Sequence, residues 1–194
     1  MRRRRMTRAF RTDPVPAALL DDLVELAARA PSAGKSQGWH LVVLTGDERA
    51  RFWDLTMPPE ERQGFAFPHL LDAPVIALPL ADPQAYLDRY SEPDKIASEL
   101  GESTSSWPAP YWTIDTSMAV MTVLLAAEDV GLGALLFGVF RGEAELRATL
   151  RIPEGLVLLG AIALGYPVRG ATRAGTSAGR RRRRPDEIIH RGGW

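Results

Sequence analysis

The chain of 194 residues contains no cysteine. This absence excludes a disulfide framework, thiolate catalysis and every cysteine-ligated metal or iron–sulfur site. Histidine is scarce too, because His40, His69 and His190 are widely separated and form no pair at the spacing of a metal site. No Gly-x-Ser-x-Gly elbow or Walker loop is present either. If the protein is an enzyme, a cofactor is therefore expected to carry the chemistry.

Long hydrophobic runs are also missing. The longest candidate, residues 156–164, is interrupted by Gly160 and falls short of the roughly 20 residues that a membrane span needs. The basic start, residues 1–5, has no apolar segment behind it, so we expect no signal peptide and a cytoplasmic location. Lys+Arg and Asp+Glu both number 24, and this zero net charge disfavours bulk nucleic-acid binding.

Lysine is rare, with Lys35 and Lys95 as its two members, and the other 22 basic residues are Arg. Arginine forms one cluster at residues 2–5 and another at residues 180–184. Taken alone, the clusters are solvated tails or a patch for nucleic acid or lipid. The alternative is that both converge on one phosphate-bearing ligand, because guanidinium groups bind phosphate bidentately.

Apolar residues make up 45% of the chain, enough for one domain with a substantial core. Their spacing predicts helices over residues 17–28, 47–55, 85–90, 112–130 and 143–150. It predicts strands over residues 39–44, 73–80, 133–137 and 156–164. Pro79 indicates that the second strand ends at a sheet edge. The helix over 112–130 is apolar nearly all round, which predicts burial, and Gly131 is its expected cap. Residues 81–110 have poor periodicity and read as a long excursion over the core, and the apolar tail after Pro185 is expected to dock.

The order of several motifs resembles the FMN-dependent nitroreductase family. The residues that carry the likeness are Arg4-Arg5-Met6-Thr7-Arg8-Ala9-Phe10, Ala30-Pro31-Ser32-Ala33-Gly34-Lys35-Ser36-Gln37-Gly38-Trp39, Pro110 to Asp115, the helix from Met118 to Val130, Gly131-Leu132-Gly133, Arg151 to Gly155, Leu164-Gly165-Tyr166-Pro167 and the arginine-rich segment before Pro185. No single motif is decisive, but the ordered set spans nearly the whole chain, residues 1–194.

The resemblance implies an α+β sandwich, with a central, mostly antiparallel sheet flanked by helices. It implies an intertwined homodimer with FMN at the subunit interface and no metal. The residues it assigns to the cofactor are Arg4, Arg5, Met6, Arg8, Lys35, Leu136, Phe137, Gly138, Arg181 and Arg183, together with Pro31, Ser32 and Ala33 from the partner subunit. In this interpretation Arg181 and Arg183 grip the phosphate, and residues 180–194 dock at the FMN site and on the partner subunit.

Two residues depart from the family pattern. Met6 stands where Ser is usual, so a side-chain hydrogen bond is replaced by backbone contact alone. Lys35 stands where Asn is common, and it either stabilises an anionic reduced flavin or points to solvent. Asp115 lies near a predicted helix start, where a cap is the favoured interpretation. Aromatic residues in or beside the excursion either pack or line the substrate site, and those assigned to the site are Phe65, Trp107, Tyr111 and Trp112.

These features predict an enzyme that passes a hydride from NADH or NADPH through flavin N5 to a small acceptor such as a nitroaromatic or a quinone. No catalytic side chain is required by this scheme. One alternative is a specialised relative that uses FMN or a deazaflavin for dehydrogenation or reductive removal of a substituent. A third hypothesis is a non-enzymatic arginine-tail protein that binds nucleic acid or lipid.

Overall fold

A computed structural model describes residues 4–171, 175 and 177–194. Its helices are α1 (Ala17–Ala27), α2 (Gly46–Thr56), α3 (Pro59–Arg62), α4 (Pro83–Tyr90), α5 (Tyr111–Asp129) and α6 (Glu143–Leu150). Its strands are β1 (Trp39–Leu44), β2 (Val75–Ala81), β3 (Gly133–Phe137), β4 (Val157–Leu158) and β5 (Ala161–Gly165). All the strands and longer helices expected from the sequence are therefore found. The ends of β1, β3 and α6 are as predicted, and the ends of the other elements are shifted.

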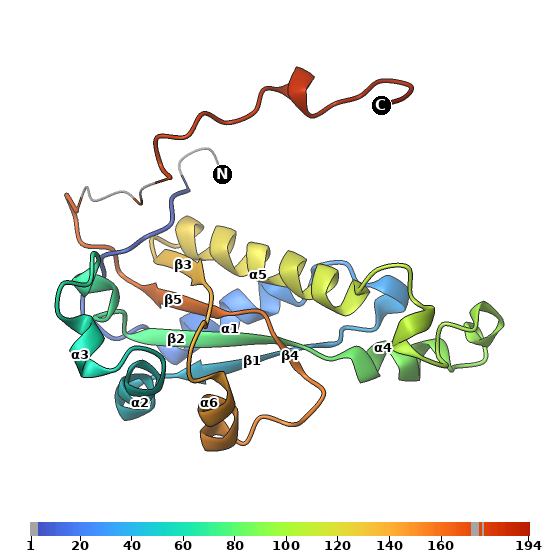
Figure 1. The fold of residues 1–194 in the computed structure, drawn as a ribbon, viewed down its shortest axis with the longest axis horizontal. Helices are drawn as coiled ribbons and strands as arrows, with labels where there is room; N and C mark the ends of the chain where they lie inside the picture. Colours follow the sequence, from blue (N-terminus) through green and yellow to red (C-terminus); the bar gives the residue numbers. More distant parts are fainter. Residues whose placement is uncertain (1–3, 172–174, 176) are drawn as a thin grey trace.

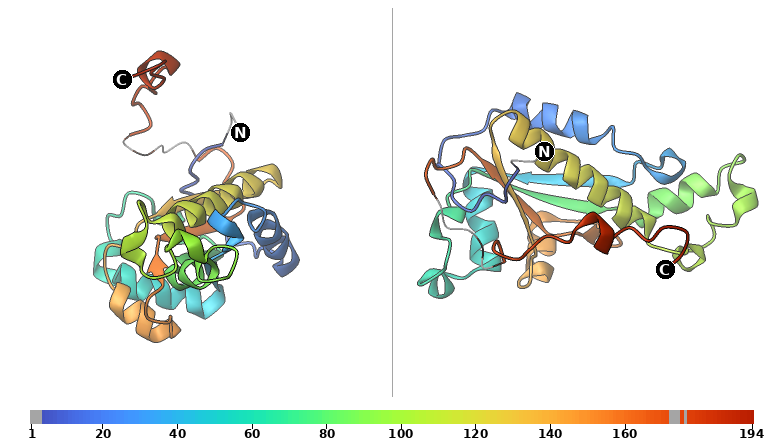
Figure 2. Two further views of the ribbon diagram at one scale, coloured as in Figure 1. Left: turned by 90° about the vertical axis from the view of Figure 1, so that its right-hand side faces the viewer. Right: turned by 90° about the horizontal axis from the view of Figure 1, so that it is seen from above.

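The strands form one sheet in the order β1-β2-β5-β3, with β4 also paired to β2 (Figure 1). Every pairing between these strands is antiparallel, as the resemblance implied. α1 and α5 cover one face of the sheet, and α2 and α6 cover the other (Figures 1 and 2). The α+β sandwich is thus confirmed.

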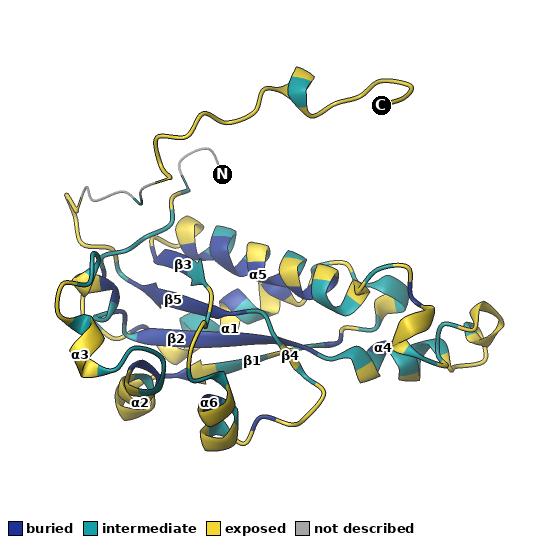
Figure 3. Cartoon of the chain, in the orientation of Figure 1, coloured by how far each residue is buried: buried dark blue, intermediate teal, exposed yellow. Residues whose placement is uncertain are grey.

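The central strands are apolar without interruption because both of their faces are buried. Along β2, Val75 and Ala77 pack with α1 and α5, whereas Ile76 and Leu78 pack with α2 and α6. Every residue of β2 and β5 is buried, as the dark strands in Figure 3 show. This two-sided core is the rigid platform on which the loops at either end of the sheet are held.

Local signals set several helix ends. Asp82 caps α4 by accepting hydrogen bonds from the backbone N–H of Gln84 and Ala85, at 2.9 and 3.3 Å. At the end of α5, Gly131 adopts a left-handed φ of 80°, and the Leu132 N–H bonds to the Ala127 carbonyl at 2.8 Å. The predicted glycine cap is therefore confirmed.

The predicted strand over 156–164 is divided into β4 and β5 by Gly160, whose φ is 125°. Pro79 was expected near a sheet edge, and this is wrong, because β2 lies between β1 and β5. The Pro79 carbonyl accepts a hydrogen bond from the Leu159 N–H at 3.0 Å, so its ring nitrogen faces the same side of the strand. The missing N–H therefore falls at the break between β4 and β5, where no ladder bond is needed.

The prediction that the long helix is buried is only half right for a single chain. One face of α5 packs on the sheet, but Ile114, Met121 and Val130 are exposed. Within the described residues, no helix is long and apolar enough to cross a membrane.

Two segments project from the sandwich (Figure 1). Residues 81–110 carry α4 and short 3-10 helices at 96–98 and 104–106, and they extend past one end of the sheet. The segment 180–194, called the C-terminal arm below, runs away from the body and carries exposed Ile188, Ile189 and Trp194.

Candidate functional site

The N-terminal segment lies along the edge strand β3. Met6 forms a parallel bridge with Ala134, and the Thr7 N–H donates to the Ala134 carbonyl at 3.0 Å. Phe10 is fully buried and bridges Pro167. The segment is therefore fixed at both ends, and the basic side chains of residues 4–8 are displayed beside the sheet.

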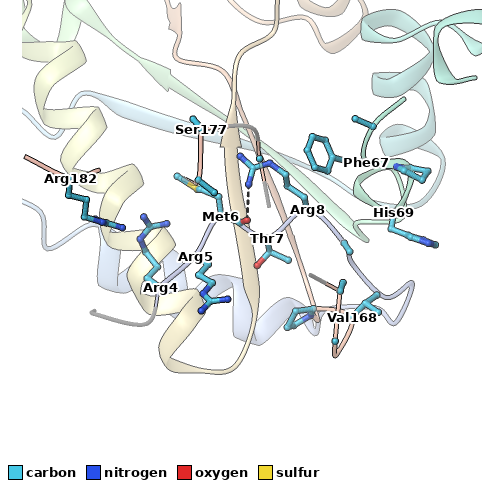
Figure 4. A pocket seen from close by; sticks show the side chains of 18 residues that line it. Arg4, Arg5, Met6, Thr7, Arg8, Phe67, His69, Val168, Ser177 and Arg182 are labelled. Carbon is cyan, nitrogen blue, oxygen red and sulfur yellow. Dashed lines mark hydrogen bonds between the residues drawn. The ribbon is translucent and has the colours of Figure 1, made fainter. Parts of the chain in front are cut away.

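A hollow of about 1100 Å³ opens beside this segment (Figure 4). It is lined by Arg4, Arg5, Met6, Thr7, Arg8, Ala9, Ala66, Phe67, Pro68, His69, Pro167, Val168, Gly170, Ala171, Gly175, Ser177, Ala178 and Arg182. These described residues include four Arg and no Asp or Glu. We call this hollow the basic groove, and its charge suits an anionic ligand.

Arg8 is the most constrained cation of the basic groove. Its Nη1 donates to the Met6 carbonyl at 3.2 Å, and its guanidinium lies 5.3 Å from the centre of the Phe67 ring. A Cβ built on Gly175 would lie only 2.9 Å from Arg8 Nη2, so the glycine permits close packing. In the view of Figure 4, Arg4 and Arg182 lie to the left of Met6, Arg8 lies to its right, and Arg5 lies below it.

The four N-terminal residues assigned to the cofactor, Arg4, Arg5, Met6 and Arg8, thus come together in one groove. The C-terminal arm contributes Arg182 to it, whereas Arg181 and Arg183 are not among the lining residues. Arg181 instead makes two 2.7 Å contacts with the Glu187 carboxylate. This hydrogen bonding lowers the pKa of Glu187 below its usual range. The arrangement ties Arg181 to the arm itself.

Leu136, Phe137 and Gly138 lie at the end of β3 and just after it. The Phe137 ring stacks on Trp53 with ring centres 5.7 Å apart and planes 6° apart. Its side chain therefore packs on the α2 face of the core.

Pro31, Ser32, Ala33 and Lys35 lie in the loop between α1 and β1, called the α1–β1 loop below. The pairing register places this loop far from the basic groove within one chain. Trp39 pairs with Ala81 at one end of β2, whereas Ala134 reaches Val75 at the other end through Leu164. A single chain therefore does not bring the loop and the groove together.

The aromatic residues assigned to the substrate site fall into two places. Trp107 packs with Tyr111 and Trp112 at the α4 end of the sheet, at ring-centre distances of 5.5 and 6.3 Å. Trp107 is buried and donates from Nε1 to the Leu100 carbonyl at 2.8 Å, which makes it a core residue of the 81–110 segment. Phe65 lies elsewhere, edge to face with Phe67 of the basic groove.

Asp115 has a role that sequence reasoning missed. It was expected to cap a helix, but it lies in the second turn of α5 and is only 7% exposed. Its Oδ2 accepts hydrogen bonds from the Ala33 N–H at 2.8 Å and from the Tyr86 hydroxyl at 2.7 Å. Burial raises the pKa of Tyr86, and the bond to Asp115 raises it further. A carboxylate inside an apolar helix was the available signal, but its partners are 82 and 29 residues away in sequence.

Thr7, His69 and Arg182 of the basic groove were also not assigned to a site from the sequence, and Phe67 was considered only as an aromatic residue that either packs or covers the flavin. Phe67 and His69 reach the groove from the segment after α3, and only the fold brings this segment to residues 4–8. No sequence motif marks Phe67 or His69.

Comparison with known proteins gives a consistent result. The model of the nitroreductase family matches residues 1–166. A Thermus thermophilus protein named NADH dehydrogenase is 31% identical over 179 residues, which cover 85% of this chain and 83% of that protein. A nitroreductase family protein from Streptococcus pneumoniae has a similar structure, with a TM-score of 0.74, 20% identity and coverage of 96% and 95% of the two chains. A Desulfovibrio desulfuricans protein assigned as a nitroreductase and solved with FMN gives a TM-score of 0.67 at 22% identity, covering 97% of this chain and 91% of that one.

Proposed function

The chain belongs to the nitroreductase family, and from this premise we propose that it is an FMN-dependent oxidoreductase. The reaction would pass a hydride from NADH or NADPH to a small acceptor, with a nitroaromatic or a quinone as the candidate class. The observation that carries the proposal is the basic groove, in which four Arg and no described carboxylate line one hollow.

The groove fits the phosphate of a flavin mononucleotide by its charge. A phosphate monoester is a dianion at neutral pH, and guanidinium groups are its preferred partners. When bound, FMN supplies the hydride chemistry at its N5 atom. The chain then has to bind, orient and shield it. We assign to the phosphate end the four arginines that line the groove, Arg4, Arg5, Arg8 and Arg182. Arg183, the next residue on the same arm, is a further candidate for contact with the phosphate.

The flanking backbone would orient the ring. Met6 cannot supply the hydroxyl that Ser offers at this position, so its contribution is backbone contact alone. Leu136 and Gly138 offer backbone groups beside the N-terminal segment, because Ala134 of the same strand is paired with Met6. In this scheme the protein positions the flavin and stabilises its charge. No side chain acts as an acid or base.

A homodimer is part of the proposal. The α1–β1 loop and the basic groove lie at opposite ends of the sheet in one chain, so the loop of a second copy is what would complete each site. The exposed apolar side chains of α5 and of the C-terminal arm are candidate interface residues. Arg181 would then act within the arm, through Glu187, and not directly on the phosphate.

The acceptor pocket is proposed at this interface. Phe65 lies beside the basic groove. Tyr111 and Trp112 lie near the α1–β1 loop, at the opposite end of the sheet. In a dimer these two groups would face one another, and their flat rings suit flat, electron-poor acceptors. The cytoplasmic location expected from the sequence stays a prediction.

The test is an absorption spectrum of the purified protein with and without added FMN, followed by anaerobic NADH or NADPH. We expect protein-bound flavin bands that bleach on addition of nucleotide. Arg8→Gln should raise the dissociation constant of FMN by at least about tenfold, because it removes a charge-assisted contact. Arg29→Gln is the matched control, since Arg29 is exposed and pairs with Glu25 on α1. A folded protein that retains no flavin after incubation with excess FMN and removal of the free flavin would refute the proposal.

A further inference from the structure

The α1–β1 loop has an unusual backbone. Gly34, Lys35 and Gln37 all have positive φ, at 59°, 58° and 53°. Only glycine adopts this region without a steric penalty, so Lys35 and Gln37 are strained. Strain of this kind persists only where the surroundings enforce it, and it is concentrated at functional sites.

Part of the enforcement is local. Ser32 accepts two hydrogen bonds, from the Gln37 N–H to its Oγ at 3.0 Å and from the Lys35 N–H to its carbonyl at 2.9 Å. These bonds close the loop on itself. They do not fix the loop to the rest of the molecule.

Two further bonds attach the loop to the helices beside it. Asp115 Oδ2 of α5 accepts from the Ala33 N–H at 2.8 Å, and Arg89 Nε of α4 donates to the Gly34 carbonyl at 2.8 Å. The Tyr90 ring lies against Gly34, where an added Cβ would be 2.8 Å from the ring. The loop is therefore attached through its backbone at Ala33 and Gly34, and at its end the Gly38 carbonyl accepts a further hydrogen bond from the Asp82 N–H at 3.0 Å.

The attachment at Asp115 is made by a buried carboxylate that depends on its hydrogen bonds. The carboxylate is 7% exposed, and the Tyr86 side chain that donates to it is 1% exposed. Within the described residues, Asp115 has no ion pair with Lys or Arg. A buried carboxylate without a counter-charge is costly and depends on its hydrogen bonds. Both of those bonds reach the same oxygen, one from α4 and one from the loop.

The hydroxyl of Tyr86 is separable from the packing of its ring. The ring contacts Trp107 and Trp112 edge to face, at 5.7 and 6.2 Å between centres. These contacts join α4 to α5 whether or not the hydroxyl is present. The Tyr86–Asp115 bond therefore adds little to the packing of the helices, and its specific effect is to orient the carboxylate toward the Ala33 N–H.

We propose that Tyr86 and Asp115 are positioning residues, which hold the strained α1–β1 loop in the conformation that completes the flavin site of a partner subunit. The inference rests on the proposed function for the identity of the ligand. The attachment itself is a property of the single chain. Without it, the loop relaxes, and Ser32 and Lys35 lose their placement.

The experiment compares Tyr86→Phe, which removes one hydroxyl and keeps the ring, with wild-type full-length protein. Two quantities are measured: hydrogen exchange of the amides of residues 33–37 without flavin, and the dissociation constant of FMN from quenching of flavin fluorescence. We expect exchange at these amides to rise and the dissociation constant to increase about tenfold, the effect of losing one hydrogen bond in the network. Tyr166→Phe is the matched control, because its hydroxyl has no hydrogen bond in the part of the chain that is described.

A second variant removes the other bond to the same carboxylate. Ala33→Pro deletes the loop N–H, and the extended backbone of Ser32, with φ −140° and ψ 147°, is compatible with a following proline. We expect faster exchange at residues 34–37 here too, so the proposal stays testable if Tyr86→Phe does not fold. Unchanged exchange in both variants would overturn the inference. Faster exchange in a protein that takes up no FMN, wild type included, would keep the attachment and refute the flavin function.

Discussion

At the scale of single residues, Arg89 connects the α1–β1 loop to the carboxylate of Asp94 on the surface. Its Nε donates to the Gly34 carbonyl, and its two terminal nitrogens contact the Asp94 carboxylate at 2.7 and 2.8 Å. Hydrogen bonding to Arg89 lowers the pKa of Asp94 from 3.8 to about 2. The unfolded chain therefore binds a proton at Asp94 at a higher pH than the folded chain does.

This difference sets the sign of a pH effect. The contribution of the Arg89–Asp94 ion pair to the free energy of unfolding is fully present above about pH 4, and it is lost as the pH falls toward about 2. We predict that the melting temperature of Asp94→Asn falls less steeply between pH 5 and pH 3 than that of the wild type. The difference is small, because the Asp94 carboxylate is exposed to solvent. Asp22→Asn is the control, and an equal flattening of the curve in that variant would show that Asp94 is not special.

At the scale of elements, the break between β4 and β5 depends on one glycine. Gly160 has a φ of 125°, and an added Cβ would lie 2.5 Å from the Phe137 carbonyl oxygen. Gly160→Ala therefore adds a clash with a neighbouring strand to the cost of backbone strain. We predict a loss of roughly 2–4 kcal/mol of unfolding free energy, measured by chemical denaturation.

Gly155→Ala provides the matched control for this prediction. Gly155 also has positive φ, at 87°, but an added Cβ there meets nothing within 4 Å. Its substitution should cost about 1 kcal/mol from the backbone alone. Equal losses in the two variants would mean that the approach of the Phe137 carbonyl does not decide the position of the break.

The same break shows why the sequence predicts elements better than their details. Periodicity and composition locate the strands and the long helices because those signals are local. The division of residues 156–164 and the tolerance of Pro79 inside the sheet depend on how three strands meet, which no local pattern encodes. Asp115 is a further example, since a carboxylate near a helix start is typical of a cap, and only the fold brings Ala33 and Tyr86 to it.

The residues of the candidate site also divide into those that the sequence predicts and those that only the fold brings together. The basic residues 4–8 were predictable because the motif is continuous in sequence, and they line one groove. Arg182 and Phe67 were not assigned to the site, because their approach to residues 4–8 depends on where the C-terminal arm and the segment after α3 run. Which arginine of a run faces a groove is a matter of backbone direction at that point.

At the scale of the whole molecule, the C-terminal arm has internal contacts but few with the sandwich. Arg184 pairs with Asp186 at 2.7 Å, and His190 stacks on Trp194 with ring centres 4.0 Å apart. Ile188 and Ile189 remain 56% and 49% exposed. Such exposure is unfavourable in water, and burial of each side chain against a second copy would stabilise a dimer by about 1.5–3 kcal/mol.

We therefore predict that the double variant Ile188→Asp/Ile189→Asp raises the dimer dissociation constant by at least about a hundredfold, because two apolar contacts per arm are replaced by charges. Sedimentation velocity over a range of concentrations measures this. FMN content should fall together with dimer content, since in the proposed dimer the α1–β1 loop of one chain completes the basic groove of the other. Ile96→Asp is the matched control, because Ile96 is 62% exposed on the separate 81–110 segment. If the arm variant remains a dimer with full flavin content, the arm does not hold the subunits together, and the exposed face of α5 becomes the surface to mutate next.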